Sequence, residues 1–486
     1  MRVAPLAVAV AAAAFLACSG PANAAGPGLL IGSSEDAVKN TSLVQAKARM
    51  SILRLAGFDS VRITSIWWPG ETKPDDDEIV ELRNTVAAAR LNGVRIFLSV
   101  YHFGNRTTPL TDEAREEFVE YVTWLAKTFP YVRDFVIGNE PNLNRFWLPQ
   151  FNEDGSDAAA PAYMELLAQT YDALKDISPQ ITVIGGTLAP RGIDRPGSSR
   201  DTHSPSRFIR DLGEAYKASG RIVPIMDQLA MHPYGDSSSQ PPKKSKHPGT
   251  TIGLADYAKL VRILGESFDG TGQRGSNLPI LYEEFGVESR IPKNKLGRYK
   301  GTEPAATKPV PEKTQAAYYK QAIQLAFCQT NVRALMLFHV FDEPARLGWQ
   351  SGLYYADSRP KTSLPRVRSA IAESRRGVVD HCRGLALTPR VLKLKWPRAR
   401  ISGKKPVQIS LTCSIDCAYI ARVEPMRGGK VVLTVRGRAV GRIASTIVLK
   451  SKKKTKAGRY RLRLSLVAPV NPGPTLKLTS PALVLG

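Results

Sequence analysis

Short apolar runs alternate with amphipathic helical stretches between residues 29 and 375. This alternation is typical of parallel strands that are joined by crossover helices. Eight such runs with intervening helices favour a closed (β/α)8 barrel, an α/β fold of the TIM-barrel type. The candidate strands begin near Leu29, Ser60, Val94, Val132, Ile181, Met226, Leu278 and Val332.

The second predicted helix begins with a cluster of acids in the segment Pro74–Glu78. Carboxylates stabilise a helix N-terminus, which explains Asp75, Asp76 and Asp77 better than a calcium site does. Gly93 ends the pattern. The apolar positions between have helical spacing and are Ile79, Leu82, Val86 and Leu91.

Beyond residue 383 the apolar positions alternate with a period of two, as in 431–436 and 460–466. Turn signals separate such runs, for example at 471–474. Short alternating strands of this kind predict a small all-β domain, an antiparallel sandwich of the Ig-like type. The expected segments are a signal peptide over 1–24, a barrel domain over 25–383 and a β-sandwich over 384–486.

Most of the net charge of +25 lies in the second of these domains. Residues 383–486 hold 23 Lys or Arg and only two acids, Asp416 and Glu424, which gives this segment a charge of +21. A surface this basic attracts polyanions such as the anionic polymers of a cell envelope. A solvated spacer domain is the alternative interpretation.

The first 24 residues have the pattern of a secretory signal peptide. Arg2 precedes an apolar run that is too short to span a membrane, and small residues near Ala24 suit cleavage. A lipoprotein signal at Cys18 is the alternative, although Phe15–Ala17 is a poor lipobox. No later apolar run is long enough for a transmembrane helix. We therefore expect an exported protein, either secreted or associated with the cell envelope.

Four cysteines follow residue 24, an even number that suits disulfides in an oxidising compartment. Cys413 and Cys417 can pair only across a turn, because an extended strand would hold their α-carbons too far apart. Cys328 lies late in a predicted helix and Cys382 follows the next one, so adjacent helices can bring them together. Zinc binding competes with this hypothesis, but no Cys-x-x-Cys pair supports it.

Two predicted strands end in carboxylates. The apolar run that starts at Phe135 ends in Asn139 and Glu140, and the run from Leu281 to Gly286 contains Glu284. A carboxylate at the end of a buried strand is costly unless it has a function. Two carboxyl groups that face each other across a polar bond suit glycoside hydrolysis, where one protonates the leaving oxygen and the other attacks or activates water.

Polar and aromatic residues also stand at the other strand ends, where a TIM barrel places its active site. In chain order these positions are Arg62, Trp67 and Trp68, then Tyr101, His102 and Phe103, then Asn139 and Glu140, then His232 and Tyr234, then Glu284, and finally His339 and Asp342. With these motifs, the segment from Leu29 to about Arg376 resembles a clan A glycoside hydrolase, close to family five.

The resemblance implies roles for individual residues. Glu140 corresponds to the acid/base and Glu284 to the nucleophile of a retaining double displacement, which predicts carboxyl groups about 5–5.5 Å apart. Asn139 resembles the residue that hydrogen-bonds the sugar 2-hydroxyl. Arg62 resembles the cation that keeps the nucleophile ionised, with a purely structural ion pair as the alternative. Tyr234 resembles the phenol that orients the same carboxylate.

His102 and His232 resemble polar groups that contact the substrate, and a histidine bonded within the core is the alternative for each. Trp349, in the loop after the eighth strand, is the candidate stacking platform for a sugar, because this strand lacks the family's usual Trp at its end. Three further tryptophans are candidates either for sugar contacts or for packing at the rim, namely Trp67, Trp68 and Trp147.

Glu283 departs from the family pattern, which has a small residue or Thr before the nucleophile. Because successive side chains on a strand point to opposite sides, only one of Glu283 and Glu284 is expected to face the site. Glu284 precedes Phe285 and Gly286 as the motif requires, so we assign the nucleophile to Glu284.

Two long connections, 236–251 and 288–313, follow strands at the catalytic face. Loops of this length in a compact domain are functional or disordered. They therefore either wall off subsites or act as mobile flaps.

The sequence predicts a secreted retaining β-glycosidase that acts on a β-linked oligo- or polysaccharide, without a cofactor and without a metal at its site. Catalytic motifs do not reveal the sugar, the linkage or exo against endo action, which depend on subsite shape. Two alternatives remain. One is a catalytically inactive carbohydrate-binding barrel, and the other is an envelope-binding protein that acts through the basic domain, with no specific nucleic-acid partner.

Overall fold

The computed structural model describes residues 26–198, 200–246, 248–383, 385–398, 400–401, 406–450 and 456–485. The expected signal peptide lies outside these ranges. Within them, no helix is both long enough and apolar enough to cross a membrane.

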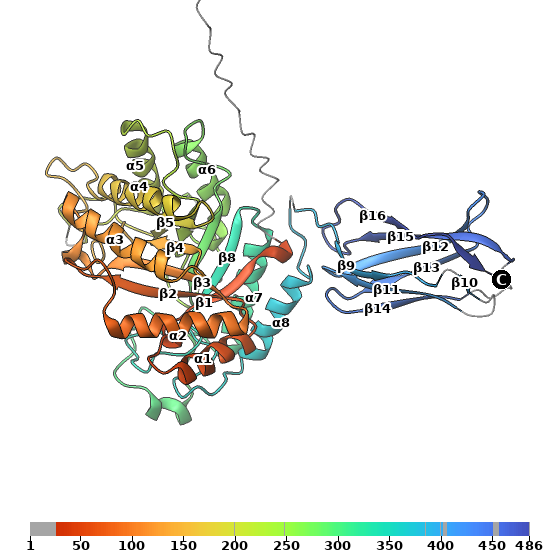
Figure 1. Ribbon diagram of the computed structural model, residues 1–486. Coiled ribbons are helices and arrows are strands. Elements are labelled where there is room, and N and C mark those ends of the chain that lie inside the picture. Colours follow the sequence, from red (N-terminus) through yellow and green to blue (C-terminus); the bar gives the residue numbers. More distant parts are fainter. Residues whose placement is uncertain are drawn as a thin grey trace, which may run out of the picture.

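Eight parallel strands close into a barrel, in which each strand pairs with the next and β8 pairs with β1 (Figure 1). The strands are β1 (Leu30–Ser34), β2 (Ser60–Trp67), β3 (Arg95–His102), β4 (Asp134–Ile137), β5 (Thr182–Leu188), β6 (Gln228–Met231), β7 (Ile280–Phe285) and β8 (Val332–Phe338). This arrangement confirms the (β/α)8 prediction and the approximate start of every strand.

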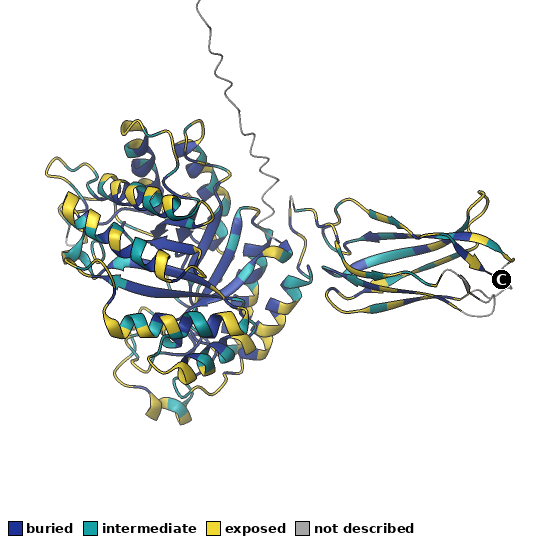
Figure 2. Ribbon diagram, in the orientation of Figure 1, coloured by how far each residue is buried: buried dark blue, intermediate teal, exposed yellow. Residues whose placement is uncertain are grey.

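The barrel is covered on its outside by helices, whose buried faces meet the strands and whose other faces are exposed (Figure 2). These helices are α1 (Leu43–Leu55), α2 (Asp76–Asn92), α3 (Asp112–Thr128), α4 (Ala159–Ile177), α5 (Pro205–Ala218), α6 (Tyr257–Phe268), α7 (Glu312–Cys328) and α8 (Leu364–Arg375). Asp75 caps α2 by accepting a hydrogen bond from the Glu78 amide, and Gly93 ends it at a φ of 60°. The acidic cluster therefore serves a helix start, as predicted.

The barrel interior is apolar in its middle and polar at the carboxyl ends of the strands. The apolar layer is formed by Leu30, Phe97, Val136, Ile184, Ala230, Leu281, Ala334 and Met336. Above it, Arg62, His232 and Glu283 are all buried. Charged groups so deep in a barrel must be paired with one another, so this polar layer is where a site has to be built.

The second domain is a β-sandwich, as predicted. Its strands are β9 (Val391–Lys395), β10 (Arg400–Ile401), β11 (Val407–Cys413), β12 (Cys417–Pro425), β13 (Leu433–Ala439), β14 (Ser445–Leu449), β15 (Gly458–Val467), β16 (Leu476–Thr479) and β17 (Leu483–Leu485). One sheet has the order β10-β17-β15-β12-β13, with β16 beside β15, and the other has the order β14-β11-β9. Side chains from both sheets form one core, for example Ile409, Ile447, Leu464 and Val423.

The sandwich is attached at the end of the barrel opposite the carboxyl ends of the strands. Cys328, the last residue of α7, forms a disulfide with Cys382. The Asp416 amide donates to the Arg376 carbonyl just beyond α8, and Ile415 packs within the core cluster of the barrel. The other disulfide joins Cys413 to Cys417. Both disulfides join cysteines that the sequence places within reach of each other.

Candidate active site

An open cleft of about 1240 Å³ lies at the carboxyl ends of the barrel strands. Asp236, Ser237 and Ser238 line it from one long connection, and Ala306 and Thr307 line it from the other. Both long connections therefore line the cleft.

Glu140 and Glu284 both line this cleft, and both lie next to His232. His232 Nδ1 lies 3.0 Å from Glu140 Oε1 and 3.6 Å from Glu284 Oε2. The sum of these distances, 6.6 Å, is an upper limit for the separation of the two oxygens. Retaining glycosidases hold their carboxyl groups about 5–5.5 Å apart, and the limit of 6.6 Å admits this separation.

The backbone of Glu140 has a conformation that few residues other than glycine adopt. Its φ is 45°, in the left-handed region. The Glu140 amide donates a hydrogen bond of 3.0 Å to the carbonyl of Thr187, at the end of β5. Strained backbone of this kind costs about 1–3 kcal/mol and clusters at functional sites, which agrees with a side chain that is aimed into a cleft.

Glu283 and Glu284 do not point to opposite sides of β7, so that expectation was wrong. The register between β7 and β8 shifts between Tyr282 and Phe285. Such a bulge re-aims side chains, and both carboxylates meet the same guanidinium, that of Arg62. Glu283 is fully buried, whereas Glu284 lines the cleft. Of the two acids, only Glu284 is open to a substrate.

Arg62 lies beneath the carboxylates and pairs with two of them. Its Nε donates to Glu283 Oε1 at 2.8 Å, and its Nη1 lies 3.3 Å from Glu284 Oε1. Its Nη2 also donates to Ser99 Oγ and, at 3.4 Å, to Asn139 Oδ1. Burial alone would lower the pKa of Arg62, but Glu283 and Glu284 outweigh it and raise that pKa. Arg62 is therefore a fixed cation beside Glu284.

His232 is buried among three carboxylates. Its Nε2 lies 3.3 Å from Glu283 Oε2, on the side of the ring opposite Glu140. Burial works against the charged ring, but Glu284, Glu140 and Glu283 together raise the pKa of His232 to about 10. The ring is thus an imidazolium at neutral pH, and both of its N–H groups donate to acids.

Tyr234, Trp349 and Asn139 complete the wall next to the acids, and all three line the cleft. The Tyr234 hydroxyl donates to Glu284 Oε2 at 3.0 Å. The rings of Tyr234 and Trp349 lie 4.9 Å apart, which forms an aromatic surface beside Glu284. Six predicted residues are therefore brought together at the cleft, namely Arg62, Asn139, Glu140, Tyr234, Glu284 and Trp349.

His102 is not brought to the cleft. It is buried, its Nδ1 bonds the Gly104 carbonyl at 2.7 Å, and its ring meets the edge of Trp147 at 5.4 Å. Burial lowers its pKa to about 4. Tyr101 lines the cleft instead. Tyr101 could have been found from the sequence by strand parity. Phe97 faces the barrel interior, and side chains two and four residues later on the strand face the same way.

The three other candidate tryptophans divide into two kinds. Trp67 and Trp147 are buried, and Trp67 packs edge-on against Phe118. They belong to the rim packing, not to the cleft. Trp68 is 45% exposed and stacks on Phe103 at 4.2 Å.

His339 and Glu343 line the cleft and were not among the predicted site residues. His339 Nδ1 bonds the Ser34 carbonyl at 2.7 Å, and its Nε2 lies 3.2 Å from Glu343 Oε1. Burial is outweighed by Glu343 and Glu35, which raise the pKa of His339 to about 8. His339 stands at the end of β8, so its position was visible in the sequence, but no motif singled it out.

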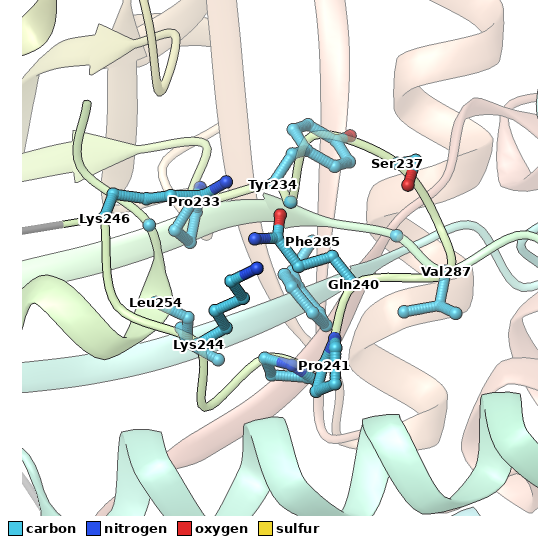
Figure 3. Close-up of a pocket in the computed structure, with 14 residues that line it drawn as sticks. Pro233, Tyr234, Ser237, Gln240, Pro241, Lys244, Lys246, Leu254, Phe285 and Val287 are labelled. Atoms are coloured by element: carbon cyan, nitrogen blue, oxygen red, sulfur yellow. The ribbon is translucent and has the colours of Figure 1, made fainter. Parts of the chain in front are cut away.

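A second hollow of about 10 Å³ lies behind the wall of the cleft. Figure 3 shows Tyr234, Gln240, Lys244 and Phe285 around it. A space of this size holds about one water molecule. It is too small for a sugar, so the open cleft is the candidate active site.

Solved glycoside hydrolases share the fold of this chain. A family 39 glycoside hydrolase from the gut symbiont Bacteroides cellulosilyticus has a TM-score of 0.51 and 14% identity, over 88% of this chain and 82% of that one. A GH5 subfamily 18 enzyme from Streptomyces cattleya, in complex with Manβ1-4GlcNAc, has a TM-score of 0.49 and 16% identity, over 77% and 84%. A β-glucuronidase from Bacteroides uniformis has a TM-score of 0.44 and 10% identity, over 95% of this chain and 46% of that one.

This chain therefore spans less than half the length of that β-glucuronidase. No protein-family model and no curated protein sequence matches the chain. At identities this low, the likeness to solved structures concerns the fold. The fold that the resemblance implies is confirmed: the chain forms a closed (β/α)8 barrel, and a solved family 39 glycoside hydrolase shares its fold.

Proposed function

We propose that the chain is a retaining β-glycosidase in which Glu140 is the acid/base and Glu284 the nucleophile. The observation that carries this proposal is the shared neighbour His232, which holds oxygens of both acids within 3.6 Å of one ring nitrogen in an open cleft. A carboxylate pair at this separation suits direct attack at the anomeric carbon followed by hydrolysis of a glycosyl-enzyme.

The surroundings support these two roles. Glu284 has a guanidinium at 3.3 Å and a phenol hydroxyl at 3.0 Å, which hold its carboxylate in a fixed position. Arg62 also fixes Asn139, the residue assigned to the sugar 2-hydroxyl. Trp349 and Tyr234 offer an apolar face for a pyranose ring. The substrate is then a β-linked oligo- or polysaccharide, and no cofactor takes part.

The test is chemical rescue of the missing nucleophile. Glu284→Gly should abolish hydrolysis of an activated aryl β-glycoside, and azide should restore turnover with formation of a glycosyl azide. Glu283→Gly is the matched control, because it removes the adjacent acid of the same strand. Rescue of Glu283→Gly but not of Glu284→Gly would assign the nucleophile to Glu283. A parent protein that cleaves none of a broad panel of β-glycosides would favour the carbohydrate-binding alternative.

We further propose that the sandwich binds an anionic polymer of the cell envelope through one sheet. In that sheet Arg422 of β12 lies directly opposite Arg463 of β15, and Arg436 of β13 lies in the next row. Like charges directly opposite destabilise a sheet. Glu424 pairs with Arg463 at 2.7 Å, and Asp416 is the other acid of this segment. A bound polyanion would supply the charges that the chain lacks.

Salt-dependent sedimentation with cell walls tests this second proposal. Arg438 lies one row beyond Arg436 on β13. The triple variant Arg422→Gln, Arg436→Gln and Arg438→Gln removes three cations of this sheet and should lose most of the binding seen at low salt. Binding by the parent should weaken at high salt, where exposed charges are screened. A control variant changes three exposed cations of the barrel, Arg83, Lys127 and Lys217, to Gln. Equal binding by both variants would remove the anchoring proposal and leave the catalytic one untouched. Substitution is preferable to truncation, since Cys382 and Ile415 tie the sandwich to the barrel.

Export is the third part of the proposal. It is supported by the two disulfides and by the signal-like pattern of residues 1–24. N-terminal sequencing of the protein recovered from culture medium or from the cell envelope tests it, and a mature N-terminus near residue 25 is the expected result.

A further inference from the structure

Three buried side chains with metal-binding groups meet outside the cleft, between the loop that precedes α4 and the first turns of α5. They are Asp157, His203 and Asp211, and one ligand atom from each lies within 4.8 Å of the others. Their side chains are 5%, 1% and 7% exposed. Among the described residues this is the one grouping of at least three such side chains.

His203 has one ring nitrogen that is hydrogen-bonded and one that is not. Its Nε2 lies 2.8 Å from the Gln150 carbonyl. Because a carbonyl oxygen can only accept, the ring proton belongs on Nε2, and Nδ1 carries the free lone pair. Nδ1 is buried without a hydrogen-bond partner. A histidine whose second nitrogen is fixed by a backbone carbonyl is the usual arrangement of a metal ligand.

Each of the two carboxylates has one oxygen that accepts a hydrogen bond from an N–H group. Asp157 Oδ1 accepts from the Ala160 amide at 2.9 Å and also lies 3.4 Å from His203 Nε2. Asp157 Oδ2 is buried and accepts no hydrogen bond from an N–H group of the described residues, and the Asp157 carboxyl lies within hydrogen-bonding reach of the Asp211 carboxyl. Asp211 Oδ2 accepts from Arg207 Nε at 2.6 Å, which leaves Oδ1. A buried polar atom without a partner is costly, and His203 Nδ1 is such an atom. Together with two buried carboxyls that face each other, it points to a missing cation.

We propose that Asp157, His203 and Asp211 bind one divalent transition-metal ion, Zn²⁺ or Mn²⁺. One imidazole nitrogen with two carboxylate oxygens is a donor set of this class. Calcium and magnesium prefer oxygen donors throughout. Bonds of about 2.0–2.2 Å require the donor atoms to close in by roughly an ångström, which rotation of the three side chains supplies.

The ion has a structural role that is independent of the proposed glycosidase activity. Asp157 ends the loop that begins at Glu140 and lines the cleft through Leu143 and Phe146. His203 is already joined to this loop, since its amide donates to the Asn142 carbonyl at 2.9 Å. A metal ion would therefore tie the loop that carries the proposed acid/base to the start of α5.

The experiment measures metal content and thermal stability of the untagged full-length protein. The metal is first removed with a chelator, and the protein is then incubated with ZnCl2 or MnCl2 and passed through gel filtration. Elemental mass spectrometry should then find about one equivalent of the ion bound to the protein. The melting temperature should rise with the concentration of that ion, because only the folded state holds the site. Asp157→Asn and Asp211→Asn should each lose both effects. Asn at position 157 keeps the oxygen that accepts from the Ala160 amide.

Glu153→Gln is the control, because Glu153 is an exposed acid of the same loop, and it should bind and respond as the parent does. Two aspartate variants are used so that one remains informative when the other fails to fold. The proposal is overturned when the parent retains no stoichiometric metal, or when Asp157→Asn and Asp211→Asn retain as much as the parent. Neither result would bear on the roles of Glu140 and Glu284.

Discussion

The two adjacent acids of β7 should respond to the same substitution in opposite ways. Glu283 is fully buried and accepts from Arg62 Nε at 2.8 Å and from His232 Nε2 at 3.3 Å. Glu283→Gln keeps the volume of the side chain but removes its charge, which leaves two buried cations short of an anion. Breaking a buried pair in this way costs about 3–5 kcal/mol.

The corresponding change in melting temperature follows from the size of the chain. Unfolding entropy is about 2.1 cal/mol/K per residue, so a chain of 486 residues has an entropy on the order of 1 kcal/mol/K. Glu283→Gln should therefore lower the melting temperature by about 3–5 °C. Glu284 is more exposed, at 12%. Glu284→Gln should leave the melting temperature within about 1 °C and reduce kcat by at least about 10³-fold.

The pH dependence of stability provides a second readout. Burial opposes ionisation of Glu283, but Arg62 and His232 outweigh it and lower its pKa. A carboxyl with a depressed folded pKa adds stability above its unfolded pKa of about 4.3, and this stability is lost as pH falls through the folded pKa. The Glu283→Gln variant lacks this contribution to stability, so its free energy of unfolding should fall less steeply below about pH 4. Calorimetry and steady-state kinetics measure both variants. A Glu283→Gln protein that is stable but inactive would refute the assignment of the nucleophile to Glu284 and of a structural role to Glu283.

Three further changes follow from the same layer and its surroundings. His232→Gln should flatten the pH dependence of stability on the alkaline side. The pKa of His232 in the folded state, about 10, lies above its unfolded value, so the stability due to His232 is complete below about pH 6.5 and is lost as pH rises towards 10. Urea unfolding at several pH values measures this dependence. Tyr234→Phe removes the hydrogen bond to Glu284 and should lower kcat/KM by roughly 10- to 100-fold with little effect on folding. Lys361→Met should cost about 3–5 kcal/mol, because its fully buried ammonium bonds Asp342 at 2.7 Å; adding Asp342→Asn should restore part of that loss in the same unfolding assay.

The fold could be predicted from the sequence because its local signals agree with one another. The strand starts, the cap at Asp75, the end of α2 at Gly93 and the change of period after residue 383 all appeared in the structure where the pattern predicted them. Strand ends in a (β/α)8 barrel lie on one face by topology. Glu140, Tyr234 and Glu284 were therefore expected to lie close together before any side-chain position was known.

The misses have a common cause, which is the direction of side chains at the ends of strands. His102 was assigned to the site by the family resemblance, although strand parity turns its side chain away from the barrel interior. The bulge in β7 turned Glu283 and Glu284 towards the same guanidinium, and a shift of register between two strands leaves no local mark in the sequence. The domain boundary at residue 383 also remains a prediction, since Leu387 and Ile415 pack into the core of the barrel.

The most direct test of the account is the anomeric form of the first product. An aryl β-glycoside that the protein cleaves is hydrolysed in an NMR tube, and the anomeric proton is followed before mutarotation equilibrates the sugar. Two displacements at one carbon restore its configuration, so the account predicts that the β-anomer forms first and the α-anomer follows slowly. An α-anomer that forms first would mean inversion, and Glu284 would then activate water instead of forming a bond to the sugar.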